Sequence, residues 1–154
     1  MIFSLSLIAL LGNQKWTGTF YKKIALKDLG LCIQLGHNGQ SCQSPSTVHY
    51  NFVVVDISGV HLVNIQYCQC HQNIGGSLPH IQLLRFQWFP TSLTRPCTAF
   101  TFDVLDTFHH ITLQGKLSVY DFYCSLLNKT DGTGILILKV SVTIYFVEWL
   151  SDNV

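Results

Sequence analysis

The clearest hydrophobic pattern lies in the middle of the chain, where two runs rich in β-branched residues, 52–57 and 60–67, are separated by Ser58 and Gly59. Runs of this kind are typical of strands, and a Ser-Gly pair between them is typical of a turn, so the pattern predicts a β-hairpin. The turn also sets which side chains lie opposite each other. The predicted pairs are Asp56 with His61, Val54 with Val63, Phe52 with Ile65, and, at the open end, His49 with Cys68.

Before the hairpin, leucine and isoleucine recur between residues 24 and 35. Their spacing predicts a short helix or turn that ends near Gly30, followed by a strand that runs into Gly36. Polar residues with a glycine and a proline then mark residues 36–47 as a loop.

After the hairpin, the apolar run 81–85 predicts a strand, with Pro90 as a stop shortly beyond it. Two helices should follow, one with Thr101 as its N-cap and one that starts after Ser118 and stops at residues 131–132. The apolar positions with helical spacing are Phe102, Leu105, Phe108 and Ile111 in the first, and Val119, Phe122, Tyr123, Leu126 and Leu127 in the second. We therefore predict an α+β fold: a hairpin-centred antiparallel sheet with two C-terminal helices packed on it.

Composition narrows the class of protein. A chain of 154 residues suits one domain. With 48% hydrophobic and only 11% charged residues, the chain is expected to expose some apolar surface. The net charge of +1 gives no overall attraction to a polyanion, so a nucleic-acid contact would need a local cluster such as Lys22, Lys23 and Lys27.

Neither end of the chain predicts a membrane anchor. Residues 1–11 are apolar like the core of a signal peptide, but they lack a basic start and a convincing small-residue cleavage site. The second apolar run, residues 135–150, is interrupted by Lys139 and Glu148 and is shorter than the roughly 20 residues that span a bilayer. We expect no membrane contact.

Cysteine and histidine carry the candidate chemistry. Six Cys and seven His fit either disulfides in an oxidising compartment or metal ligands in a reducing one. His37 and Cys42 lie in the predicted loop, Cys68 and Cys70 follow the hairpin, and the hairpin should bring the two pairs together. One imidazole and three thiols are a ligand set that Zn²⁺ accepts. The alternative is a set of buried thiols beside a loop histidine.

Several other histidines are assigned substitute-ligand, structural or surface roles. His49 and His71 are possible substitute metal ligands because of their positions near the cluster. His61, opposite Asp56 in the predicted register, is a structural partner of that carboxylate rather than half of an acid–base dyad. His109 and His110 are expected on a helix surface.

The cysteines without a neighbouring ligand are expected to be buried thiols; these are Cys32, Cys97 and Cys124. Trp88 and Phe89 are expected in the core, although an aromatic face for nucleic acid is the alternative. No nucleophile–base motif, phosphate-binding glycine loop or carboxylate pair at catalytic spacing is present in the sequence, so nothing in it supports catalysis.

A series of short motifs in fixed order resembles the CxC-type cysteine cluster domain associated with the KDZ (Kyakuja, Dileera and Zisupton) transposases of fungi. The resemblance covers about residues 15 to 134. The motifs are Trp16-x-Gly18, Leu29-Gly30-Leu31, Gln34-Leu35-Gly36-His37, Cys42, Pro45, Phe52-x-Val54-x-Asp56-x-x-Gly59-x-His61, Cys68-x-Cys70, Gln82-Leu83-Leu84-Arg85, Trp88-Phe89-Pro90, Thr98-Ala99-Phe100-Thr101-Phe102-x-x-Leu105, Tyr120-Asp121-x-Tyr123 and Thr130-Asp131.

The resemblance implies that the cluster binds Zn²⁺ through His37, Cys42, Cys68 and Cys70, with His61 as a further position of the family pattern. It implies a non-catalytic module that binds DNA, such as transposon ends, or assembles a complex with the transposase catalytic region, and hence a nuclear location. A protein-interaction module is the alternative.

The two ends depart from the family pattern. Residues 1–14 stand where the family usually has a further Cys/His-rich segment, and residues 135–154 are apolar where it continues with charged sequence. We expect both ends to be non-homologous to the family. This implies a fragment, or a decayed transposon remnant without activity of its own.

Overall fold

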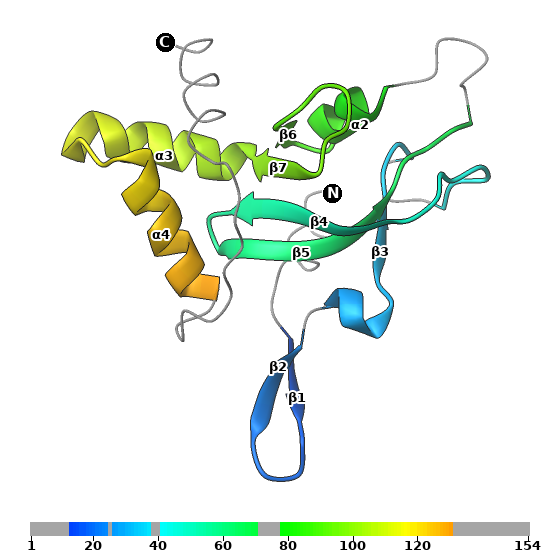
Figure 1. Cartoon of the computed structure of the whole chain (residues 1–154), viewed down its shortest axis with the longest axis horizontal. Helices are drawn as coiled ribbons and strands as arrows, with labels where there is room; N and C mark the ends of the chain where they lie inside the picture. Colours follow the sequence, from blue (N-terminus) through cyan, green and yellow to red (C-terminus); the bar gives the residue numbers. More distant parts are fainter. Residues whose placement is uncertain (1–12, 25, 38–40, 71–77, 131–154) are drawn as a thin grey trace.

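The computed structural model describes residues 13–24, 26–37, 41–70 and 78–130 (Figure 1). The elements in chain order are strands β1 (Asn13–Trp16) and β2 (Tyr21–Ile24), the 3₁₀ helix η1 (Leu26–Leu29), strands β3 (Cys32–Gln34), β4 (His49–Asp56) and β5 (Gly59–Gln66), helix α2 (Pro79–Arg85), strands β6 (Trp88–Pro90) and β7 (Thr98–Thr101), and helices α3 (Phe102–Gly115) and α4 (Val119–Thr130). The predicted turn near Gly30 and the strand before Gly36 are confirmed as η1 and β3.

The main sheet has five strands in the order β3-β5-β4-β7-β6, and β1 and β2 form a separate two-stranded sheet. The predicted α+β class and the central β4–β5 hairpin are confirmed. The sheet is mixed, however, and not wholly antiparallel, because β3 runs parallel to β5 and β7 runs parallel to β4. Local sequence patterns predict hairpins, but they do not determine which edge of the hairpin a distant strand joins.

The predicted register of the hairpin is wrong by two residues. Its turn is Ile57-Ser58, so Asp56 pairs with Gly59 and Val54 pairs with His61. The Asp56 carboxylate accepts hydrogen bonds from the amide (3.1 Å) and the hydroxyl (2.6 Å) of Ser58, which starts the turn one residue earlier than predicted.

This shift also changes the open end of the hairpin. His49 lies opposite Ile65 and not opposite Cys68, after an irregularity in the pairing between His49 and Phe52. Cys68 instead forms an isolated antiparallel bridge with Pro45.

The prediction of a strand at 81–85 is also wrong, because these residues lie in helix α2. A short apolar run fits either a strand or a buried helix, and the deciding signal is Pro79 at the first turn, where a proline suits a helix start. Pro90 ends β6, which is an edge strand of the sheet, so its missing amide hydrogen costs no ladder hydrogen bond.

The two predicted C-terminal helices are confirmed as α3 and α4. The Thr101 hydroxyl accepts a hydrogen bond from the Val104 amide (3.3 Å) and thereby caps α3. The Ser118 hydroxyl accepts one from the Asp121 amide (3.1 Å) at the start of α4. Ile111 departs from the predicted apolar stripe, because its side chain is 40% exposed. No helix in the described part of the chain is both long and apolar enough to cross a membrane.

Two apolar clusters fill the core. The first joins the hairpin to α3 and α4, and its buried members are Val55, Val60, Phe100, Val104, Leu105, Phe108, Phe122, Tyr123 and Leu126. The second joins the hairpin to β3, α2 and β6, with Leu35, Phe52, Val54, Val63, Ile65, Leu83, Trp88 and Ala99 buried. The prediction that Trp88 belongs to the core is confirmed, since it is 1% exposed and stacks on Phe52.

Candidate metal centre

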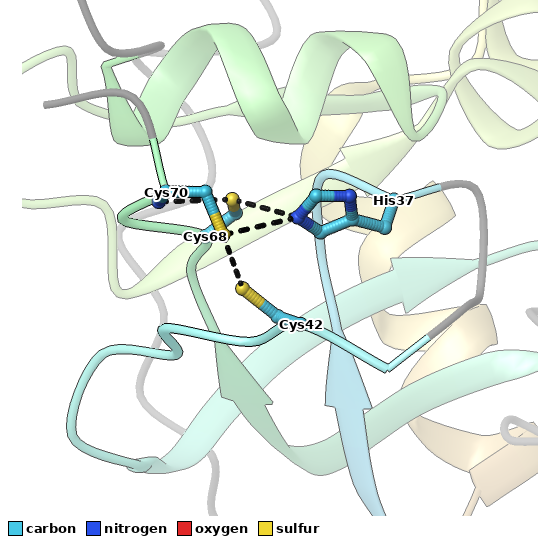
Figure 2. A group of neighbouring side chains, drawn as sticks. All are labelled: His37, Cys42, Cys68 and Cys70. Atoms are coloured by element: carbon cyan, nitrogen blue, oxygen red, sulfur yellow. Dashed lines mark hydrogen bonds between the residues drawn. The ribbon is translucent and has the colours of Figure 1, made fainter.

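Four side chains from two loops meet beyond one end of the main sheet. The ligand atoms of His37, Cys42, Cys68 and Cys70 all lie within 4.8 Å of one another (Figure 2). His37 Nε2 is 3.1 Å from Cys68 Sγ and 3.4 Å from Cys70 Sγ, and Cys42 Sγ is 3.4 Å from Cys70 Sγ. The structure therefore brings together the four residues that the sequence placed in two separate pairs.

The donor set and its spacing fit a tetrahedral metal ion. Bond lengths of about 2.3 Å to sulfur and about 2.0–2.1 Å to nitrogen put neighbouring zinc ligands about 3.6–3.8 Å apart. The separations here are close to that value, and all four residues are half-buried. Soft thiolate ligands with imidazole favour zinc over hard cations such as Mg²⁺ or Ca²⁺. All six cysteines are free thiols in this structure, including Cys42 and Cys70.

The parallel pairing of β3 with β5 explains why the two loops meet. Gln34 and Gln66 are paired at the ends of these strands, and parallel strands end at the same edge of a sheet. His37 follows Gln34 by three residues and Cys68 follows Gln66 by two, so both emerge at this edge. The sequence-based prediction attributes the approach of the two loops to the hairpin alone and does not include the parallel pairing of β3 with β5.

Backbone hydrogen bonds return Cys42 to the same place. The loop after β3 pairs with the segment after β5, because the Ser46 amide donates to the Tyr67 carbonyl (2.8 Å) and the Gln69 amide donates to the Ser44 carbonyl (2.9 Å). This short ladder sets Cys42 beside Cys70.

Three glutamine side chains hold the backbone of the ligand loops. Gln82 of α2 is buried, and its amide accepts from the Cys68 N–H (2.8 Å) and donates to the Cys68 carbonyl (2.9 Å). Gln34 accepts from the Cys42 N–H (2.9 Å) and donates to Gln66 Oε1 (3.2 Å), and Gln66 donates to the Ser46 carbonyl (3.1 Å). The glutamine hydrogen bonds therefore support both loops in addition to any metal–ligand bond.

A glycine allows the closest approach of the two loops. Gly36, directly before His37, has φ +104°, and a Cβ at this position would lie 2.6 Å from Cys68 Cβ. A side chain here would push Cys68 away from His37. In the sequence, Gly36 and the three glutamines resemble ordinary strand, loop or motif residues. The one indication of a special role is that Gln82 is a polar residue within the apolar run 81–85.

Contacts within the cluster change the acidity of two thiols. Hydrogen bonds with the Cys42 thiol, with His37 and with the Ser44 backbone lower the pKa of Cys70 to about 6. Burial raises the pKa of Cys68 to about 11. Metals bind thiolates, so the lowered pKa of Cys70 favours metal binding, whereas binding by Cys68 requires release of its proton.

The structure separates His49 and His61 from this cluster. The His49 ring makes T-shaped contacts with the rings of Phe52 and Tyr67, with centroids 6.2 and 6.5 Å away, and His49 does not belong to the four-residue group. His61 Nε2 lies 3.0 Å from the Ser58 hydroxyl. His71 lies outside the described residues.

The predicted position of His61 opposite Asp56 is wrong, because His61 pairs with Val54. The Ser58 hydroxyl links the two side chains, since it donates its hydrogen to Asp56 and lies beside His61 Nε2. Thr101 also donates to the Asp56 carboxylate (2.8 Å). His110 is confirmed on the surface of α3, with Nε2 3.6 Å from Asp106 Oδ1, and His109 is half-buried on the same helix.

The prediction that Cys32, Cys97 and Cys124 are buried thiols is wrong, because none of them is fully buried. Cys97 is exposed, and Cys32 and Cys124 are half-buried. None of the three belongs to the candidate metal-binding group found among the described residues.

A family model described as the CxC2-like cysteine cluster associated with KDZ transposases matches residues 26–134. The chain belongs to this family. The resemblance inferred from the order of short motifs is thereby confirmed, and all four residues of the candidate metal-binding group lie within the matched part of this CxC2 domain. Comparisons with curated proteins and with solved structures gave no match.

Proposed function

We propose that this CxC2 domain is a non-catalytic zinc-binding module of a KDZ-type transposase, bounded by residues 15 and 134, which binds DNA in the nucleus or assembles the transposition complex. The observation that carries the proposal is the convergence of one imidazole and three thiols within 4.8 Å. A zinc ion held by His37, Cys42, Cys68 and Cys70 would cross-link the loops after β3 and β5. Its role would be structural, because all four ligand positions are filled by protein.

The family supports a role beside a transposase, because its description associates the cysteine cluster with those enzymes. Zinc modules of this size commonly present a rigid surface to DNA or to another protein. DNA at the transposon ends is the first candidate partner, and the catalytic region of the transposase is the second.

The test uses the purified full chain. Elemental analysis should find about one zinc per chain, and a chelator should release it. Cys42→Ser with Cys70→Ser should abolish retention of zinc, while Cys97→Ser, which changes an exposed thiol outside the cluster, should leave it unchanged. A wild-type chain without zinc, or with zinc that survives the double substitution, would contradict the metal site.

DNA binding is tested by a separate measurement. The zinc-loaded chain should bind DNA with an affinity that falls as salt rises, because phosphate contacts release counterions. Zinc without any DNA binding would favour the role in complex assembly, and co-purification of the domain with the transposase catalytic region would then be the decisive measurement.

A further inference from the structure

Two thiols of the candidate metal centre face each other from different loops. Cys42 Sγ lies 3.4 Å from Cys70 Sγ, although the two residues are 28 positions apart in the sequence (Figure 2). Both are free cysteines, and both are half-buried, so neither thiol is sealed from small solutes. The sulfur atoms of a disulfide are about 2.05 Å apart, so these two sulfurs are close to bonding distance.

The backbone beneath the two thiols is already joined. The Gln69 amide donates a hydrogen bond to the Ser44 carbonyl (2.9 Å), which ties one loop to the other. Cys42 precedes Ser44 by two residues. Cys70 directly follows Gln69. The two loops are therefore held together, and a bond between the sulfurs needs movement of the side chains rather than a new approach of the loops.

The third thiol of the cluster, Cys68, is held in a different way. Gln82 binds both its backbone N–H (2.8 Å) and its carbonyl (2.9 Å). Its Sγ lies 3.1 Å from His37 Nε2 and accepts a hydrogen bond from the Cys70 amide (3.4 Å). These contacts keep Cys68 beside His37 and leave Cys42 as the thiol partner of Cys70.

A bond between Cys42 and Cys70 is incompatible with a zinc ion in the cluster. Zinc in a structural site requires four ligands, and cysteine binds it as a thiolate. A disulfide removes two of the four ligands, so His37 and Cys68 are left as the remaining pair. Oxidation of the cluster and retention of zinc therefore exclude each other.

We propose that the cluster is a redox switch, in which hydrogen peroxide oxidises Cys42 and Cys70 to a disulfide and the zinc ion is released. The release of zinc rests on the proposed function, whereas the disulfide itself requires only the two thiols. Cross-linking by zinc and cross-linking by the disulfide would then be two alternative states of the same pair of loops.

The reaction balances with one peroxide molecule for each disulfide. One thiolate attacks a peroxide oxygen, the O–O bond breaks, and a sulfenic acid and hydroxide form. The second thiolate attacks the sulfenic sulfur, the S–O bond breaks, and a second hydroxide leaves. The two sulfurs together lose two electrons to the peroxide, both hydroxides take up protons to become water, and zinc leaves as Zn²⁺ without a change of oxidation state.

The test treats the full chain with hydrogen peroxide in two forms, zinc-loaded and freed of zinc by a chelator. Peptide mapping by mass spectrometry after alkylation of free thiols should find Cys42 linked to Cys70 in both forms. A chromophoric indicator should report one zinc ion released for each disulfide formed in the loaded form. Reduction with dithiothreitol should restore the capacity to bind zinc.

Three variants locate the reaction. Cys42→Ser should abolish the linked peptide. Cys68→Ser keeps both reacting thiols, so its zinc-free form should still yield the linked peptide. Cys97→Ser is the matched control, because it removes an exposed thiol outside the cluster and should leave both the disulfide and the release of zinc unchanged.

Several results would overturn the redox switch: a disulfide from Cys68 instead of the predicted pair, conversion of the thiols to sulfinic acids without any disulfide, or zinc that stays bound to a chain carrying the disulfide. A wild-type chain that holds no zinc before peroxide is added would reject the proposed function and the release step together. A zinc-loaded chain that forms no disulfide between Cys42 and Cys70 would reject the redox switch alone.

Discussion

The two ends of the β4–β5 hairpin are held by different interactions. At the turn end, Val55 and Val60 are buried against α3 and α4, and Asp56 is buried with hydrogen bonds from Ser58 and Thr101. Beyond the open end, the described loop residues 41–46 and 67–70 include no fully buried side chain. Burial stabilises the turn end by itself, whereas the open end depends on glutamine hydrogen bonds and on its ligand cluster.

Helix α4 strengthens the turn end further. The Thr130 hydroxyl accepts from the Val60 amide (2.6 Å), and Lys129 donates to the Ile57 carbonyl (3.0 Å). Thr101 both caps α3 and donates to Asp56, so it joins the helix start to the turn. The fold thus has one end that forms without metal and one end whose order should follow metal occupancy.

Removal of metal should have the largest effect and should act on one end only. At free zinc about 1,000-fold above the dissociation constant, bound zinc adds about 4 kcal/mol to the free energy of unfolding. Hydrogen exchange with and without chelator should show lost amide protection after β3 and β5 and retained protection in α3 and α4. Equal loss at both ends would contradict this difference between them.

Gln82→Leu should weaken the open end next. The substitution leaves the half-buried amide and carbonyl of Cys68 without their side-chain partner, which costs about 3 kcal/mol in all. Zinc affinity should fall about 10- to 100-fold, the usual effect of removing a group that orients a ligand. Competition with a chromophoric chelator measures it.

Gln114→Leu is the matched control, because Gln114 is exposed on α3. A zinc affinity equal in the two variants would show that Gln82 has no positioning role.

Gly36→Ala isolates the contact between the two ligand loops. Gly30 has a similar φ (+87°), but no atom lies within 4 Å of the position that a Cβ would occupy, so Gly30→Ala carries the backbone strain alone. Gly36→Ala adds the clash with Cys68, and we expect about 2 kcal/mol more destabilisation than in the control. Urea unfolding of both variants gives the difference, and similar values would show that the loops separate freely.

Asp56→Asn should have the smallest effect and should spare the metal. Burial raises the pKa of Asp56, but hydrogen bonds from Ser58 and Thr101 outweigh this and bring the pKa below its ordinary value. The ionised carboxylate therefore stabilises the fold fully above the unfolded-state pKa of about 3.9, and this contribution is lost as pH falls through the folded-state pKa.

We expect Asp56→Asn to cost about 1 kcal/mol at pH 7 and to reduce the loss of stability in acid. Asp106→Asn, at a 73% exposed position, is the control. Unfolding curves between pH 3 and 7 measure both, and a variant as acid-sensitive as the wild type would show that Asp56 is not the group responsible.

The sequence by itself determined the features that depend on local spacing. β-Branched runs around a short polar turn were sufficient for the hairpin, and Thr101 and Ser118 were sufficient for the helix starts, because capping involves residues only three apart. The ligand pairs were visible for the same reason: each pair is close in sequence. The order of short motifs was enough to indicate the family.

Tertiary structure decided what depends on distant partners. Thr101, 45 residues away in the sequence, donates a hydrogen bond to Asp56 at the hairpin turn, and the joining of His37 to Cys68 followed from the parallel pairing of β3 with β5. Gln82 became a support for Cys68 only because α2 packs beside the ligand loop. No local pattern encodes these contacts, because the energy of each depends on which segments, far apart in the chain, are buried side by side.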